Sequence, residues 1–182
     1  YRIAKTLGKD ARIVANVETP SIKDLYESIK DQYQEVFISS ETALAQVDSG
    51  TLVVVVDTHK KTYVGSPELL TKTNKIVVID HHRRSADFID NSILTFQEVY
   101  ASSAAELVTE IIQYTQNEVE LSEVEDHGMI TVTLLSLVAS SISILLFNKY
   151  KFICFDSSLW MIDTFSRTML SLSQVVVLSP IE

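Results

Sequence analysis

Two aliphatic runs, each ending in an acid followed by histidine, set the strongest limit on how this chain folds. They read LVVVVDTH at Leu52–His59 and KIVVIDHH at Lys75–His82. An aliphatic run without polar alternation is typical of a strand buried on both faces, as in a parallel sheet. Because ligands bind at the carboxyl ends of the strands in open α/β sheets, we expect the two polar ends to meet at a functional edge.

Helical and extended segments alternate along the first 126 residues. Helices are predicted at Tyr1–Leu7, after Pro20, at Glu41–Val47 with Ser40 as N-cap, for one short turn after Ser66, and after the capping box Ser103–Glu106. Further strands are predicted at Ala11–Asn16, Val36–Ile38 and Ile93–Phe96. This alternation predicts an α/β fold with one doubly wound parallel sheet and right-handed crossovers.

The composition limits the classes of function. With 182 residues, 46% of them hydrophobic, the chain is long enough to bury one substantial core. Its net charge of −9 argues against binding double-stranded nucleic acid, because neutralising phosphates requires clustered Lys and Arg, and it suits a site that attracts cations. The single cysteine, Cys154, excludes an internal disulfide.

The character of the sequence changes near residue 126. Residues 127–182 contain three acidic and three basic residues, so the net charge lies upstream, and Met129–Phe147 has no charged residue over 19 positions. Such a stretch is long enough for a membrane helix, although Ser and Thr interrupt it. Three interpretations stay open: a membrane helix, a buried core segment, and a sequence that is not the natural continuation of the domain, as after a frame change in the coding DNA.

The two polar ends offer ligands for divalent cations. Carboxylates and neutral imidazoles suit Mn²⁺, Mg²⁺ or Zn²⁺. Two such ions promote phosphoester hydrolysis, because they activate a water molecule and stabilise charge on the phosphoryl group. The alternative is that His81 and His82 are ordinary strand-end residues satisfied by hydrogen bonds. An Asp-His-His triplet after one buried strand, with Asp57 after another, favours the metal site.

Three segments, VVVDTHK, VVIDHHRR and YASSAAELVTE, resemble the DHH phosphoesterase superfamily, in particular its membrane-anchored bacterial cyclic-di-AMP phosphodiesterases. The resemblance runs from Tyr1 to about Glu125 and is strongest over Leu52–Glu110. It implies a hydrolase that converts cyclic di-AMP to the linear dinucleotide with two Mn²⁺ ions. It also implies a parent protein anchored by segments outside this chain, with this domain at the cytoplasmic face of the bacterial plasma membrane, and it is compatible with a homodimer.

The resemblance further implies roles for the residues at the strand ends. Asp57 matches an Asp that bridges two manganese ions, and His81 matches a His that binds one of them. His82 matches the residue that meets the substrate phosphate. Asp80 is implied to fix the tautomer and orientation of His81. The catalytic residues implied by the resemblance are therefore Asp57, His81 and His82.

Five further residues are candidate contacts of the substrate. His59, Arg83 and Arg84 lie where substrate phosphates are expected, although exposed arginines after a strand are often only solvated. Ser102 and Ser103 stand at the start of a helix and can present hydroxyl and N–H groups to a phosphate. The alternative for both serines is that they only cap the helix.

The resemblance has gaps. The family's first motif, a His and two Asp residues, is expected just before Tyr1, and its fourth-motif Asp is expected beyond Glu125, where Leu134–Val138 has no acid. The family's second domain, with its glycine-rich substrate motif, is not matched. We therefore predict residues 1–125 as a partial DHH domain that retains a bridging ligand and one terminal ligand. Residues 126–182 are predicted as an atypical apolar tail that does not match the family.

Two other functions stay open. A related oligoribonuclease or exonuclease of the same superfamily would use the same strand-end chemistry. A non-catalytic module that binds metal or nucleotide without turnover is favoured for the isolated chain by the unmatched first and fourth motifs.

Overall fold

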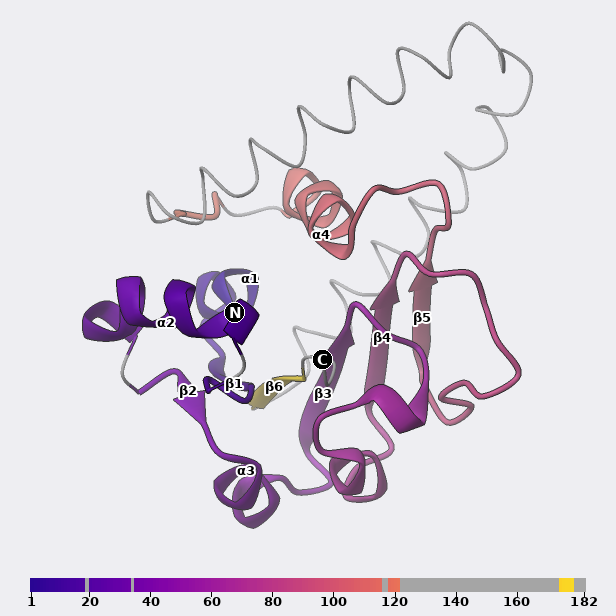
Figure 1. The fold of residues 1–182 in the computed structure, drawn as a ribbon, viewed down its shortest axis with the longest axis horizontal. Helices are drawn as coiled ribbons and strands as arrows, with labels where there is room; N and C mark the ends of the chain where they lie inside the picture. The colour runs from indigo at the N-terminus through magenta and orange to yellow at the C-terminus, as the bar shows by residue number, and fades with distance from the viewer. Residues whose placement is uncertain (19, 34, 116–117, 122–173, 179–182) are drawn as a thin grey trace, which may run out of the picture.

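The structure, a computed structural model, describes residues 1–18, 20–33, 35–115, 118–121 and 174–178. Within these ranges the chain forms a six-stranded sheet in which every neighbouring pair of strands is parallel (Figure 1). The strand order is β2-β1-β6-β3-β4-β5. The predicted α/β fold with a parallel sheet is therefore confirmed.

Strands and helices alternate along most of the chain. The strands are β1 (Asp10–Val14), β2 (Phe37–Ile38), β3 (Thr51–Val56), β4 (Ile76–Asp80), β5 (Leu94–Gln97) and β6 (Gln174–Leu178). The α-helices are α1 (Arg2–Thr6), α2 (Pro20–Tyr33), α3 (Ser40–Gln46) and α4 (Ala104–Gln113). Two short 3₁₀ helices between β3 and β4 are η1 (Lys61–Tyr63) and η2 (Pro67–Thr71).

The two aliphatic runs form β3 and β4, which pair with each other inside the sheet. Val54 lies opposite Val77, and Val55 lies opposite Val78. All five residues of β4 and the first five of β3 are buried. Each fully buried aliphatic side chain contributes about 1.5–3 kcal/mol. Burial on both faces explains why neither run alternates with polar residues.

Helices cover both faces of the sheet, and each face has its own core. On one face, Ala4 of α1 and Leu107 and Ile111 of α4 pack against alternate residues of β3 and β4. On the other face, Ala43 of α3 and Leu69 of η2 pack against the intervening residues. Figure 1 shows α1 and α4 on one side of the sheet and α3 on the other. The sheet is therefore doubly wound, as predicted.

Local signals decide where two of the helices end and begin. α1 is followed by Gly8, whose φ of 69° lies in the left-handed region that suits glycine after a helix. The N-cap of α3 is Ser39, whose side chain accepts a hydrogen bond from Thr42 N at 3.2 Å. The prediction of Ser40 as the cap was wrong by one residue, because the Ser40 hydroxyl pairs with Ser66 at the start of η2 instead.

One strand, β6, was not predicted from the sequence. It pairs over five residues with both β1 and β3, so that Val176 lies between Arg12 and Val53. β6 comes from the stretch that we assigned to an atypical tail, where the local strand signal is the run of three valines at 175–177. The division of the chain at residue 125 stays a prediction.

The apolar stretch Met129–Phe147, for which three interpretations were left open, lies outside the described residues. No helix in the described part of the chain is long and apolar enough to cross a membrane.

Candidate metal centre

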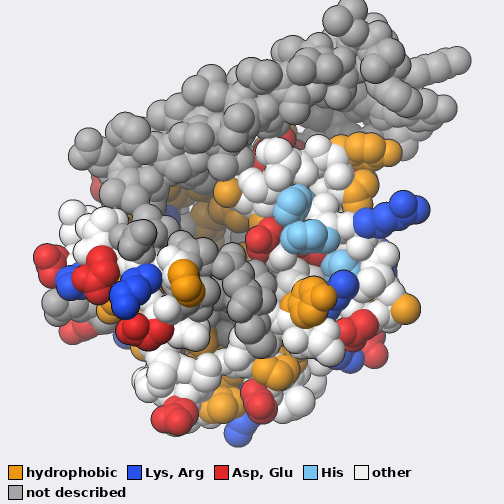
Figure 2. Space-filling model, viewed as in Figure 1, with side chains coloured by type: hydrophobic (Ala, Val, Ile, Leu, Met, Phe, Trp, Pro, Cys, Tyr) orange, Lys and Arg blue, Asp and Glu red, His pale blue; other side chains and the backbone are white. Residues whose placement is uncertain are grey.

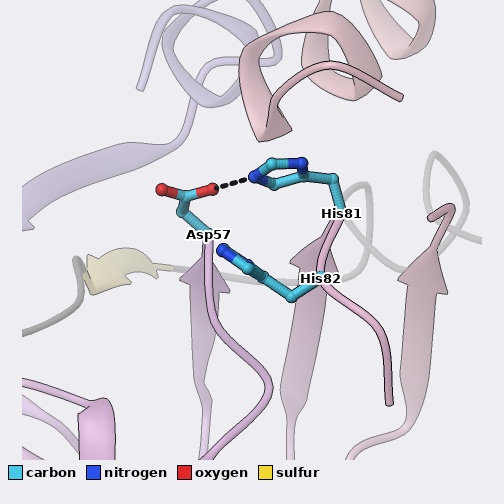
Figure 3. Close-up of side chains that lie close together, drawn as sticks. All are labelled: Asp57, His81 and His82. Carbon is cyan, nitrogen blue, oxygen red and sulfur yellow. Dashed lines mark ion pairs between the residues drawn. The ribbon is translucent and has the colours of Figure 1, made fainter. Parts of the chain in front are cut away.

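The residues that follow β3 and β4 form a cluster of potential metal ligands. Asp57 follows β3, His81 and His82 follow β4, and one ligand atom from each lies within 4.8 Å of the others. Asp57 N donates a hydrogen bond to Ile79 O at 2.9 Å, which keeps the two strand ends side by side. Figure 3 shows the Asp57 carboxylate and the His81 ring pointing toward each other, with His82 beside them. The two polar ends therefore meet at one edge of the sheet, as expected.

Asp57 adopts a left-handed backbone conformation, with a φ of 64°. Within the described ranges it is the one non-glycine residue with a positive φ. Aspartate tolerates this region better than most residues, but the conformation still costs free energy. Backbone strain of this kind is concentrated at functional sites, which agrees with a role for Asp57 as a ligand.

The ring of His81 is oriented through its Nδ1 atom. Nδ1 lies 3.3 Å from the carbonyl oxygen of Ala101. Because a carbonyl oxygen only accepts hydrogen bonds, Nδ1 carries the proton in this contact, so Nε2 is the atom with the lone pair when the ring is neutral. Nε2 in turn lies 3.3 Å from Oδ1 of Asp57. We expected Asp80 to orient His81, but the Ala101 carbonyl takes that place.

Asp80 orients His82 instead. Its side chain is fully buried, and Oδ1 accepts hydrogen bonds from His82 Nδ1 at 2.7 Å and from His82 N at 3.2 Å. Oδ2 lies 2.5 Å from His59 Nδ1. Burial alone would raise the pKa of Asp80, but the hydrogen bonds from His59 and His82 outweigh it and lower the pKa below its ordinary value. Asp80 is therefore an ionised acceptor that holds the Nδ1–H group of His82.

The arrangement fits a divalent cation. When the ring is neutral, His81 Nε2 and Asp57 Oδ1 are both acceptors, and two acceptors 3.3 Å apart repel each other unless a cation lies with them. A protonated ring would instead form an ion pair with Asp57. Two ligands about 2.1 Å from one ion and at a right angle to each other are about 3 Å apart, which is close to this separation. One carboxylate and two imidazoles are a donor set that suits Mn²⁺ or Zn²⁺. None of the three side chains is fully buried, so an ion can reach them.

His59 does not lie where we expected it to meet substrate phosphates. It is 3% exposed, and both ring nitrogens are engaged, Nδ1 by Asp80 and Nε2 by the backbone N–H of Ser85 at 2.9 Å. The loop after β3 folds back against the loop after β4, where Ile89 N donates to His59 O at 2.9 Å. This burial does not support a direct contact between His59 and a substrate.

Arg83 and Arg84 are exposed in the loop after β4. The guanidinium carbon of Arg84 lies 4.2 Å from the centroid of the Phe88 ring, a cation–π contact. Figure 2 shows pale-blue histidine side chains on the surface of this face with blue basic side chains near them. Positive charge near the cluster suits an anionic substrate, and a phosphate-binding role for the two arginines stays a prediction.

Ser102 and Ser103 serve the N-terminus of α4. Ser103 Oγ accepts a hydrogen bond from Glu106 N at 3.3 Å. The Glu106 carboxylate accepts hydrogen bonds from Ser102 N at 2.7 Å and from Ser102 Oγ at 2.9 Å. This is the predicted capping interaction, with the glutamate bonded to Ser102 rather than to the N-cap residue. Because the carboxylate already engages the groups that a phosphate would need, the structure favours the capping role over phosphate binding.

Three residues of the site were not singled out from the sequence: Ala101, Ser85 and Gln97. Ala101 acts through its backbone carbonyl, which carries no residue-type signal, and Ser85 contacts His59 Nε2 through both its backbone N–H and its Oγ. Gln97 ends β5, the neighbour of β4, and its Nε2 donates to His82 O at 2.6 Å. A polar residue at the carboxyl end of the adjacent strand was the signal that would have identified it.

Comparisons with known proteins show the family to which the chain is similar. The sequence profile of the DHH family, N-terminal domain, matches residues 1–142, a range that runs past residue 125. The chain is 40% identical over 129 residues to cyclic-di-AMP phosphodiesterase GdpP of Bacillus subtilis (strain 168), which covers 68% of this chain and 19% of that protein. It is 35% identical over 135 residues to cyclic-di-AMP phosphodiesterase PdeA of Listeria monocytogenes serotype 1/2a (strain 10403S), covering 71% and 20%.

A third relative has a different name. The chain is 38% identical over 88 residues to a membrane protein–large ribosomal subunit bL9 fusion protein of Onion yellows phytoplasma (strain OY-M), covering 48% of this chain and 10% of that protein. The chain thus spans about a fifth or less of the length of the curated relatives that it matches.

Proposed function

The chain belongs to the DHH family of metal-dependent phosphoesterases, and on that premise we propose that it is part of a phosphodiesterase that hydrolyses cyclic di-AMP to the linear dinucleotide. The observation that carries the proposal is the cluster of Asp57, His81 and His82 at the ends of two adjacent parallel strands. The two relatives that are 35–40% identical and named as cyclic-di-AMP phosphodiesterases support this choice of substrate.

The proposed cofactor is Mn²⁺, with two ions in the complete site. Bound divalent cations stabilise charge on a phosphoryl group and lower the pKa of a water nucleophile. In the proposal, Asp57 and His81 would hold the cations, His81 through Nε2. The hydrogen bond from His81 Nδ1 to the Ala101 carbonyl supports this role, because in the neutral ring it leaves Nε2 as the atom with the lone pair.

His82 suits either of two tasks at the same position. In its neutral form Nε2 is a ligand, and in its protonated form Nε2–H donates to a phosphate oxygen. In both forms Nδ1–H is held by Asp80 at 2.7 Å, so the ring keeps one orientation. The phosphate-binding task agrees with the exposure of the His82 side chain, which is 56%. In the proposal, Arg83 and Arg84 add positive charge for the second phosphate of the substrate.

We also propose that the whole protein acts at a bacterial membrane, with this domain on the cytoplasmic side. The support is the name of the phytoplasma relative, which describes a membrane protein.

Hydrolysis by the complete protein that contains this chain tests the proposal. With Mn²⁺ and cyclic di-AMP, Asp57→Ala is expected to lower the rate of linear dinucleotide formation at least about 100-fold, because the carboxylate that holds the cations is lost. The matched control is Asp90→Asn, which removes an exposed carboxylate whose partner is the exposed Lys61. A full rate in Asp57→Ala would remove the site assignment. Hydrolysis of linear oligonucleotides in preference to cyclic di-AMP would instead favour the related oligoribonuclease.

A further inference from the structure

A buried histidine adjoins the ligand cluster without belonging to it. His59 is 3% exposed, and Asp80 is 0% exposed. Nδ1 of His59 lies 2.5 Å from Oδ2 of Asp80, and Oδ1 of Asp80 lies 2.7 Å from Nδ1 of His82. His59, Asp80 and His82 therefore form a continuous chain of hydrogen bonds in which each carboxylate oxygen has one histidine nitrogen.

The direction of each hydrogen bond follows from the partners. Nε2 of His59 lies 2.9 Å from the backbone nitrogen of Ser85, a group that only donates, and 3.0 Å from Ser85 Oγ, which itself donates to Asp87 O. Nε2 therefore accepts from Ser85 N, and the proton is on Nδ1, where Asp80 accepts it. Gln97 Nε2 lies 3.4 Å from His59 Nδ1 but donates at 2.6 Å to His82 O, so it does not compete with Asp80 for the Nδ1 proton.

The two oxygens of a carboxylate share one rigid plane. Holding Oδ2 of Asp80 therefore fixes the rotation of the carboxylate and sets the direction in which Oδ1 meets His82. Losing the His59 donor would leave a buried, unsatisfied oxygen, and the carboxylate would turn to recover a partner. In the described part of the chain, no buried side-chain nitrogen or oxygen lacks a hydrogen-bond partner. The present arrangement is thus fully satisfied.

We propose that His59 is a positioning residue that, by fixing the Asp80 carboxylate, holds His82 in one orientation and one tautomer, with the proton on Nδ1. Nε2 of His82 then keeps one position beside Asp57 and His81. The inference concerns a residue of the same site and so rests on the proposed metal centre, but the identity of the substrate does not enter it.

Two substitutions separate this role from simple filling of the core. His59→Asn keeps an amide N–H near the position of Nδ1, facing Asp80, and loses the acceptor for Ser85. His59→Gln keeps an acceptor near the position of Nε2, facing Ser85, and loses the donor to Asp80. Each variant loses one buried hydrogen bond, so the two are matched in structural damage. The two variants differ in the group that loses its partner, which is the backbone N–H of Ser85 in His59→Asn and the carboxylate of Asp80 in His59→Gln.

The readout is the tautomer of His82, measured on the metal-free chain. Ring ¹⁵N chemical shifts distinguish a protonated from an unprotonated nitrogen, and His82→Ala assigns the signals. The measurement is made above pH 8, where an ordinary histidine is neutral.

We expect wild type and His59→Asn to show one His82 tautomer, with the proton on Nδ1. His59→Gln should show a mixture of tautomers. Equal behaviour of the two variants would overturn the proposal, because it would mean that His59 acts only by filling space. The Asn variant is decisive even if the Gln variant does not fold, because a mixed His82 tautomer in folded His59→Asn also overturns it.

Failure of the tautomer experiment is distinguishable from failure of the proposed function. The tautomer measurement involves no substrate, so an inactive protein with one His82 tautomer leaves the role of His59 intact. An active cyclic-di-AMP phosphodiesterase with mixed tautomers in His59→Asn would leave the proposed function intact and remove the role of His59.

Discussion

Nε2 of His81 faces Oδ1 of Asp57 at 3.3 Å, although the two residues follow different strands. The contact depends on the left-handed backbone of Asp57, whose φ is 64°, and on the carbonyl of Ala101, which holds the far side of the His81 ring. The backbone conformation thus positions the Asp57 carboxylate, and a hydrogen bond positions the His81 ring. The two contributions can be separated by mutation.

Replacing Asp57 by glycine or by alanine separates the strain of its backbone from the chemistry of its carboxylate. Both variants remove the ligand, but only glycine adopts a φ of 64° without a steric cost. We expect the metal-free Asp57→Gly chain to be more stable than Asp57→Ala by about 1–2 kcal/mol. Urea unfolding followed by circular dichroism measures the difference. Equal stabilities would show that the chain does not hold this left-handed conformation in solution.

The isolated 182-residue chain is expected to hydrolyse cyclic di-AMP far more slowly than the complete protein. The described residues supply three ligand atoms in one cluster, whereas two cations held at a fixed separation need more. With Mn²⁺ and equal enzyme concentrations, we expect the rate of the chain to be at least about 100-fold lower. Chromatographic separation of the linear product gives both rates. A chain that matches the complete protein, and loses its activity in His81→Ala, would contradict this expectation.

The sequence predicted the sheet and the meeting of its polar ends because both depend on patterns within short segments. β3 and β4 are buried on both faces, so every position is aliphatic, and parallel pairing brings Asp57 and His81 to one edge. The partner of Asp80 was also within reach. A carboxylate at a strand end often bonds the backbone N–H two residues later, and here that residue is His82.

Other features depend on contacts between distant segments and leave no local pattern. The burial of His59 results from the packing of two loops, through the bond from Ile89 N to His59 O. The orientation of His81 depends on a backbone carbonyl, that of Ala101, which any residue would supply. Residue types in the sequence therefore indicated the candidate ligands, but not the groups that orient them.

The stability of the chain should respond to the charge of Glu110 on α4. Burial raises the pKa of Glu110, and the nearby carboxylates of Glu106 and Glu98 raise it further. A carboxyl group with a raised pKa binds its proton more tightly in the folded state, so it destabilises the fold when ionised at neutral pH. This destabilisation disappears as the pH falls through the ordinary glutamate pKa of about 4.3, because the carboxyl group is then protonated in both states.

Glu110→Gln should therefore be more stable than wild type at pH 7, by about 0.2–0.5 kcal/mol from the relieved repulsion with Glu106 one turn away. The gain should shrink toward pH 4. Thermal unfolding at both pH values measures it, and Glu35→Gln, which removes an exposed carboxylate between α2 and β2, is the matched control. A Gln variant that is less stable than wild type at pH 7 would contradict the burial of the charge.

The position of β6 between β1 and β3 predicts that its backbone is needed for the sheet. Val176 lies opposite Arg12 on one side and Val53 on the other, so a strand here has neighbours on both edges. Proline lacks the N–H group and is not tolerated inside a sheet, so Val176→Pro should lower the free energy of unfolding by about 3 kcal/mol or more. Val176→Thr keeps both the N–H group and the branched side chain and is the matched control. Urea unfolding that gives the same midpoint for the Pro and Thr variants would show that residues 174–178 do not pair with β1 and β3 in solution. A loss confined to the Pro variant would place part of the predicted tail inside the domain.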